Sequence, residues 1–145
     1  MLSGWQDCQR INVRPDAREL EMQKWVLLLA GGLIGTAGQY ALTGTVHRWF
    51  GTAFPYGTLA VNTVGCLAVG FFGTLADQKL MLSSEARVFW MIGLLGAFTT
   101  FSALIYESWR LIQDGKILLA STNMLGSLVL GLAALWLGHL MASVL

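Results

Sequence analysis

Charged residues are scarce in this sequence. They make up 12% of the chain, whereas 55% of its residues are hydrophobic, and a soluble domain has about 25% charged residues. The shortage excludes an ordinary water-soluble domain, and a net charge of +1 without a basic patch gives no reason to expect a nucleic-acid partner.

Cysteine is also scarce. Cys8 lies in a polar segment and Cys66 in an apolar run, so neither a disulfide nor a CxxC metal site is predicted.

What the sequence does contain is four long apolar runs, at about residues 25–46, 57–76, 88–112 and 117–145. A membrane-spanning helix needs about 20 mostly apolar residues. We therefore predict an all-α membrane protein in the cell inner membrane or plasma membrane, with one four-helix domain over residues 24–145. Residues 1–23 are polar and are expected to form a disordered tail or a surface helix, and Met22 is a possible natural start.

The third run contains a stretch that disfavours continuous helix, Gly-Leu-Leu-Gly-Ala-Phe-Thr-Thr-Phe-Ser at residues 93–102. Glycine inside a helix costs about 1 kcal/mol relative to alanine, and the Thr and Ser side chains can hydrogen-bond local backbone. A broken helix is tolerated in a membrane where it is buried or lines a cavity. Its freed carbonyl groups can hold an ion.

Two other runs carry faces of small and polar residues at helical spacing. They are Thr58, Asn62, Gly65, Val69 and Gly73 in the second run and Asn123, Ser127, Gly131, Ala134 and Gly138 in the fourth. Such faces serve close helix packing or a polar track, and Asn62 is either interhelical glue or a pore group.

Three further polar or small-residue features accompany these faces. In the first run, Gly31 and Gly35 form a GxxxG pair, and Gln39 needs a partner or reaches the interface. Glu107 and Arg110 can form an ion pair at the end of the third run.

Charge gives no preferred orientation for the four spans. Lys24, Lys79 and Arg87 lie on one side and Arg48, Arg110 and Lys116 on the other, so the positive-inside rule does not decide. Such a chain could insert both ways. Three arginines before residue 24 would favour a cytoplasmic N-terminus.

These motifs resemble those of the Fluc/CrcB fluoride channel family. The resemblance covers the chain from about residue 24 to its end. It rests on GGxxGxxxxY at residues 31–40, GTLxVNxxG at residues 57–65 and GxxTTFSxxxxE at residues 96–107. The second and third motifs together are the specific ones.

The resemblance implies an antiparallel, dual-topology homodimer of four-helix subunits with two pores and a structural Na⁺ on the two-fold axis. The sodium ligands would be the backbone carbonyl groups of Gly96 and Thr99. The pore residues it implies are Phe101, Asn62 and Ser127, with Asn123 one turn before Ser127 and Glu107 after the break. Thr100 adds a hydroxyl group that can donate to fluoride.

Three positions depart from the family pattern. Gln39 replaces a usual arginine, Leu104 replaces a second phenylalanine, and Asn123 replaces a usual tyrosine or histidine. Leu104 removes one aromatic edge from each pore. The departures indicate either a variant channel or one chain of a heterodimer of two related chains.

The function expected is passive, fluoride-selective conduction that exports fluoride from the cytoplasm and so gives resistance to it. One alternative is a small proton-coupled multidrug-type exporter, which needs a membrane-embedded carboxylate. The first, second and fourth runs contain no Asp or Glu. A second alternative, a membrane assembly factor, leaves the break unexplained. An enzyme is not expected, because no nucleophile–base pair or metal cluster is visible.

Overall fold

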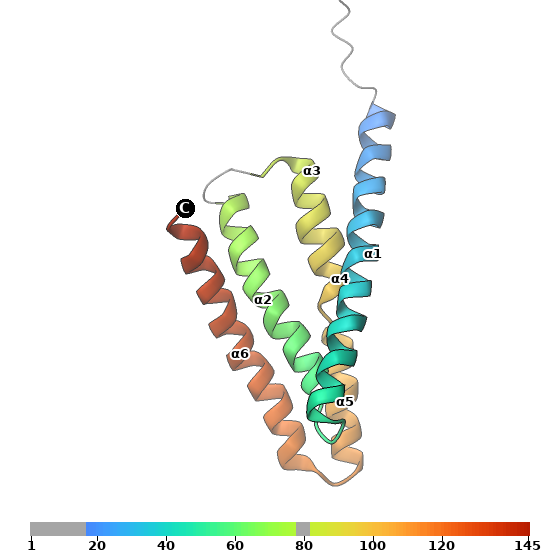
Figure 1. Ribbon diagram of the computed structural model, residues 1–145, viewed down its shortest axis with the longest axis vertical. Coiled ribbons are helices and arrows are strands. Elements are labelled where there is room, and N and C mark those ends of the chain that lie inside the picture. The colour runs from blue at the N-terminus through green and yellow to red at the C-terminus, as the bar shows by residue number, and fades with distance from the viewer. Residues whose placement is uncertain (1–16, 78–81) are drawn as a thin grey trace, which may run out of the picture.

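The protein is all-α in the computed structural model, which describes residues 17–77 and 82–145. The elements are α1 (Ala17–Phe50), α2 (Tyr56–Asp77), α3 (Ser84–Arg87), the π-helical segment η2 (Val88–Leu95), α4 (Gly96–Phe98), α5 (Phe101–Gln113) and α6 (Ile117–Ser143). Within these described residues, four stretches are long and apolar enough to cross a membrane, namely Arg18–Phe50 of α1, α2, the joined segment Ser84–Gln113 and α6. The predicted four-span fold is confirmed (Figure 1).

The first helix is longer than the sequence predicted. Its 34 residues correspond to about 51 Å at 1.5 Å per residue, against about 30 Å of hydrocarbon thickness. Figure 1 shows the N-terminal turns of α1 reaching beyond the other helices. Residues 17–23 are therefore helical, and the boundary predicted at residue 24 falls inside α1. The rest of the predicted tail, residues 1–16, lies outside the described part of the chain.

The third span is interrupted at the predicted place. Thr99 and Thr100 have extended backbone, with φ and ψ of −87° and 153° and of −146° and 109°. Beyond them α5 begins, capped by the Thr100 hydroxyl, which accepts a hydrogen bond from the Ala103 amide at 3.3 Å. Two half-helices therefore share one span, and their facing ends meet at the two threonines.

Glycines allow α1 to approach the first half of the third span closely. A methyl group on Gly31 would lie 2.6 Å from the Phe89 carbonyl oxygen, and one on Gly93 would lie 2.9 Å from the Leu28 carbonyl oxygen. A methyl group on Gly35 would clash with the Leu94 carbonyl. The predicted GxxxG contact thus fixes η2 against α1.

The second close packing joins α2 and α6. A methyl group on Gly138 would clash with the Leu67 carbonyl, and one on Gly70 would clash with the Leu135 carbonyl. The small face predicted on α6 is confirmed as an interface, since Asn123, Ser127, Gly131 and Gly138 are all buried. Gly70 lies outside the face predicted on α2, so sequence periodicity missed this contact.

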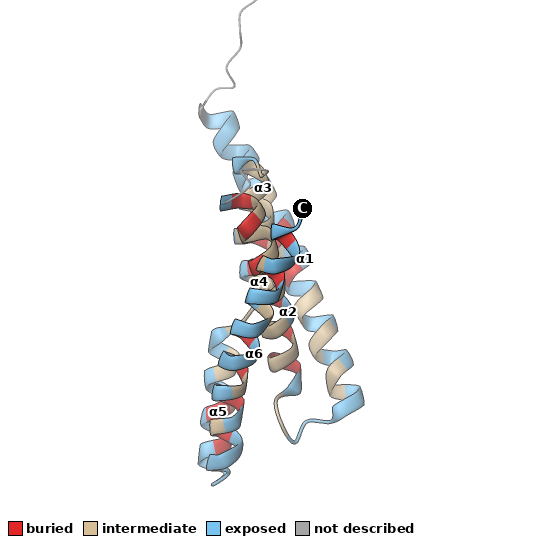
Figure 2. Ribbon diagram, turned by 90° about the vertical axis from the view of Figure 1, so that its left-hand side faces the viewer, coloured by how far each residue is buried: buried red, intermediate tan, exposed pale blue. Residues whose placement is uncertain are grey.

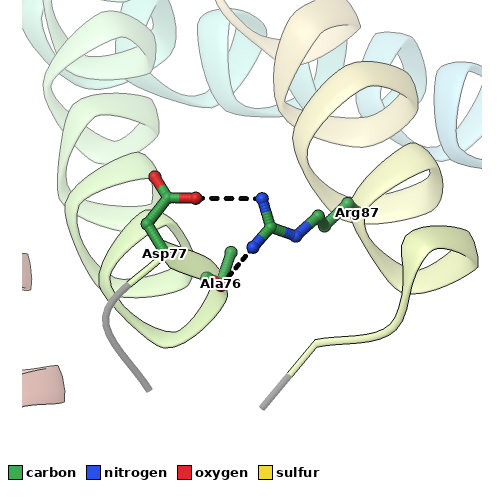
Figure 3. A network of polar contacts seen from close by, with 3 residues as sticks. All are labelled: Ala76, Asp77 and Arg87. Atoms are coloured by element: carbon green, nitrogen blue, oxygen red, sulfur yellow. Dashed lines mark hydrogen bonds and ion pairs between the residues drawn. The ribbon is translucent and has the colours of Figure 1, made fainter. Parts of the chain in front are cut away.

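An arginine ties the end of α2 to the start of the third span. The Arg87 guanidinium donates to Asp77 Oδ1 at 2.9 Å and also to the Ala76 carbonyl oxygen (Figure 3). A cation at this position complements the free carbonyl groups at the C-terminus of α2. The Arg87 side chain therefore links the C-terminus of α2 to the start of the third span.

The outer surface of the bundle is apolar. Figure 2 shows that buried positions are confined to strips along the helices, with exposed residues on the outward sides. Many exposed residues are large and hydrophobic, such as Leu33 and Leu118 at 74% and 81% exposure. A surface of this kind suits lipid or another subunit better than water. The chain is a multi-pass membrane protein.

Candidate ion pathway at the helix break

A groove of about 490 Å³ lies beside the break in the third span. Its walls come from α2, the two threonines, α5 and α6. Six of the residues predicted for the site line it: Asn62, Thr99, Thr100, Phe101, Leu104 and Ser127. Residues that are 65 positions apart in the sequence are thus brought to one surface. Gly96, Asn123, Glu107 and Gln39 are predicted site residues that do not line this groove.

Asn62 forms hydrogen bonds to the backbone at the break with both the oxygen and the nitrogen of its side-chain amide. Its Oδ1 accepts a hydrogen bond from the Thr100 backbone amide at 2.8 Å, and its Nδ2 donates to the Thr100 carbonyl oxygen at 3.0 Å. The Asn62 oxygen thus replaces the helical acceptor that the Thr100 amide lacks, and its nitrogen adds a second bond to the Thr100 carbonyl oxygen. Because Nδ2 carries two hydrogens and one is used here, the second can donate into the groove.

The break interrupts the helical ladder over four residues, so the carbonyl groups of residues 96–99 lose their helical partners, and those of Gly96 and Thr99 are among them. In a continuous helix, the Gly96 carbonyl would accept from the Thr100 amide and the Thr99 carbonyl from the Ala103 amide. The Thr100 amide donates instead to Asn62, and the Ala103 amide donates to the Thr100 hydroxyl. Backbone oxygens of this kind are ligands that hard cations accept, and the sodium site at Gly96 and Thr99 stays a prediction.

Glu107 is bound to α2 rather than to its own helix. Its Oε1 accepts a hydrogen bond from the Thr58 hydroxyl at 2.8 Å, and its Oε2 is buried without a partner in the described part of the chain. The predicted ion pair with Arg110 is wrong: the described residues form no such pair. Both residues instead line a second cavity, of about 360 Å³, at the end of α5. The buried Thr58 hydroxyl holds the carboxylate in place of the arginine.

The two polar residues predicted on α6 are buried. Asn123 is 0% exposed and donates from Nδ2 to the Ser108 hydroxyl at 2.9 Å. Ser127 is one turn further along and lines the groove, with a buried Oγ that has no partner among the described residues. Asn123 and Ser127 therefore face α5 and the groove rather than lipid.

Phe101 and Leu104 lie on the exposed side of the groove. Phe101 is 76% exposed although it lines the groove, while Leu104 is half-buried. A phenylalanine ring that contributes to a pore must be enclosed on both sides. The groove of one chain is therefore an incomplete enclosure.

Gln39 lies apart from both cavities. It is half-buried on α1, and within residues 17–77 and 82–145 its side chain makes no hydrogen bond. The described part of the chain therefore supplies no partner for Gln39, and the alternative that Gln39 reaches the membrane interface stays a prediction.

Ser108 is the residue that sequence reasoning missed. It is 2% exposed and connects α5 to Asn123 of α6. Its position, one turn after Leu104 on the face that also carries Leu111, would have marked it as inward-facing. The bond between Thr58 and Glu107 was also missed, although Thr58 belongs to the small face predicted on α2.

Comparison with known proteins extends this picture. A profile of the family described as CrcB-like protein, Camphor Resistance (CrcB), matches residues 26–139. The chain is 42% identical over 123 residues to a protein of Opitutus terrae, covering 83% of this chain and 93% of that protein. It is 44% identical over 117 residues to one from Nitratidesulfovibrio vulgaris, covering 81% and 94%. Both relatives carry the name fluoride-specific ion channel FluC.

Proposed function

The chain belongs to the CrcB-like family, and from this membership we propose that it is a passive fluoride-selective channel through which cytoplasmic fluoride leaves the cell. The observation that carries the proposal is the groove at the helix break, where Asn62, Thr100 and Ser127 meet. All three are neutral hydrogen-bond donors, and no charged residue lines this groove.

Neutral donors suit the conduction of a small, strongly hydrated anion. A pore must replace the water around fluoride, and the second Asn62 N–H and the Ser127 hydroxyl can each donate one hydrogen bond. The edge of the Phe101 ring carries partial positive charge and can favour the ion without a formal bond. Because conduction needs sites weak enough to release the ion, a row of such donors is better suited than a lysine or arginine.

The direction of transport follows from the membrane potential. An inside-negative potential favours anion exit by about 2.3 kcal/mol per charge per 100 mV. Hydrogen fluoride that crosses the bilayer dissociates in the cytoplasm, and the channel returns the anion to the outside. No coupling to a second energy source is required.

A second copy of the chain completes the enclosure. Phe101 and Tyr40 are aromatic side chains that one chain leaves 76% and 84% exposed. In an antiparallel homodimer each groove would be closed by the partner. A heterodimer with a related chain would serve the same purpose and could supply the aromatic ring that Leu104 lacks.

A sodium ion fits two of the freed carbonyl groups. Hard cations prefer oxygen ligands and take six or more of them. Gly96 and Thr99 offer one backbone oxygen each, so two subunits would contribute four. Bound there, the cation would fix the break and neutralise the oxygen dipoles at the subunit boundary.

The proton-coupled exporter is the weaker reading. It requires a carboxylate that exchanges protons with substrate in the membrane. Glu107 and Asp114 both line the cavity at the end of α5. Glu107 accepts a hydrogen bond from the buried Thr58 hydroxyl, and Asp114 is exposed in the loop after α5. The relatives are named as fluoride channels rather than drug exporters.

Growth of a fluoride-sensitive bacterial strain tests the proposal. Cells that produce the protein should grow at fluoride concentrations at least tenfold above those that stop the empty strain. Phe101→Ile, which removes the ring edge and keeps an apolar side chain, should abolish most of this gain at equal membrane abundance. Ethidium resistance without fluoride resistance would instead support the exporter.

A further inference from the structure

Gly65 lies where α2 meets the break in the third span. It is buried, and a methyl group built on it would clash with Cγ2 of Thr99. The next nearest atoms are at ordinary contact distance, with Phe98 Cδ1 at 3.5 Å and Thr99 Cβ at 3.6 Å. The glycines that join α1 to η2 and α2 to α6 face backbone carbonyl groups instead. The space left by the missing Gly65 side chain is therefore filled by one methyl group, that of Thr99.

The Thr99 side chain cannot turn its methyl group away from Gly65 without losing a hydrogen bond. Its hydroxyl donates to the Leu95 carbonyl oxygen at 3.0 Å, and the Thr99 amide donates to the same oxygen at 3.1 Å. Because both branches of a threonine start from Cβ, a fixed hydroxyl also fixes the methyl group. The last turn before the break thus holds Thr99 in one rotamer, with Cγ2 against Gly65.

Two neighbouring contacts fix the break against α2. Asn62, three residues before Gly65, bonds the Thr100 amide and carbonyl oxygen at 2.8 and 3.0 Å. Residues three apart lie on one face of a helix, so this polar contact and the Thr99 methyl contact are one turn apart on α2. Asn62, Thr99 and Thr100 all line the groove. A shift of Thr99 away from α2 would therefore move the groove wall and lengthen the Asn62 bonds.

We propose that Gly65 is a positioning residue for the ion path, because its lack of a side chain lets Thr99 approach α2 and so fixes the backbone of the break beside the groove. The same contact sets the direction of the Thr99 carbonyl group, which is the proposed sodium ligand. Its helical donor, the Ala103 amide, bonds the Thr100 hydroxyl instead. The inference rests on the proposed function and adds to it a residue that acts through Thr99.

Gly65→Ala, made in wild type and in a Thr99→Ser background, tests the contact. Thr99→Ser removes Cγ2 and keeps the hydroxyl, so the added methyl group would then meet no atom closer than 3.5 Å. Fluoride efflux from liposomes should be at least about tenfold slower for Gly65→Ala than for wild type, since overpacking must displace Thr99. In the Thr99→Ser background the same substitution should slow efflux by less than about threefold. Equal slowing in both backgrounds, or no slowing in wild type, would overturn the proposal.

Gly73→Ala is the matched control on the same helix. Gly73 does not line the groove, and a methyl group on it would lie 3.7 Å from Met91 Cε, its nearest neighbour. Fluoride efflux should therefore stay within about twofold of wild type. Slowing as large as that of Gly65→Ala would assign the effect to the loss of any glycine from α2 and overturn the proposal.

Sodium retention gives a readout that does not depend on conduction. In native mass spectra, the fraction of dimer that carries Na⁺ should fall in Gly65→Ala and recover when Thr99→Ser is added. If Gly65→Ala alone forms no dimer, the double substitution should restore both dimer and efflux. Sodium retention equal to wild type in Gly65→Ala, or a double variant that does not recover, would refute the role of Gly65 and leave the channel standing. Absence of fluoride efflux in wild type would refute both.

Discussion

At the scale of single residues, Asn62 has two tasks that the sequence could only present as alternatives. As interhelical glue, it bonds the Thr100 amide and carbonyl at 2.8 and 3.0 Å. As a proposed pore group, it keeps one N–H for the groove that it lines. The same amide therefore links the shape of the break to the chemistry of the ion path.

Asn62→Asp partly separates the bond to the Thr100 backbone from the donation of an N–H into the groove. A carboxylate keeps the acceptor for the Thr100 amide, loses both N–H donors, and adds negative charge where the anion passes. We expect fluoride efflux from liposomes to fall at least 100-fold while the protein remains dimeric by size-exclusion chromatography. Asn62→Asp efflux within threefold of wild type would remove Asn62 from the ion path.

At the scale of elements, α5 is a half-helix positioned by polar side chains. In the part of the chain that the structure describes, Asn62 of α2 bonds the Thr100 amide at the start of α5, and Thr58 of α2 bonds Glu107 in its middle. Asn123 of α6 bonds Ser108 on the buried face of α5. The preceding half, η2, is instead held by glycine contacts with α1. The two halves of one span are thus stabilised by different physical means.

The glycine contacts lead to a stability prediction on α6. Gly138→Ala places a methyl group against the Leu67 carbonyl, whereas a methyl group on Gly126 meets no atom within 4 Å. Overpacking of this kind costs about 1–3 kcal/mol. In detergent, Gly138→Ala should lower the melting temperature clearly and Gly126→Ala should not. Equal melting temperatures for the two variants would argue against the α2–α6 packing.

What could be predicted from the sequence at this scale was local. The break was predictable because Gly93, Gly96 and the two threonines act on their own backbone. The bonds of Glu107 and Ser108 were not, because they depend on how α5 rotates against α2 and α6, which no local pattern specifies. The length of α1 was underestimated since the hydrophobic criterion stops at charged residues, whereas helical hydrogen bonding continues through them.

At the scale of the whole molecule, the single chain leaves its proposed ion path open. Phe101 is 76% exposed beside the groove. The freed carbonyl groups of Gly96 and Thr99 are too few for a cation on their own. The proposed second copy would cover the exposed ring and would raise the number of carbonyl ligands from two to four.

Native mass spectrometry of protein released from detergent tests this assembly. Two chains with one tightly bound Na⁺ are expected, because two copies supply four carbonyl ligands. Exchange into potassium should lower the fraction of dimer, since a larger ion fits the same oxygens less well. A monomeric species that conducts fluoride at the full rate would contradict the assembly.

The central claim is that an interrupted span builds a path for fluoride, and the most direct test is anion efflux from liposomes that contain the purified protein. With a potassium ionophore to balance charge, fluoride should leave within seconds and chloride at least 100-fold more slowly, as followed by ion-selective electrodes. Fluoride retained as in protein-free liposomes, or chloride released as fast as fluoride, would contradict the account.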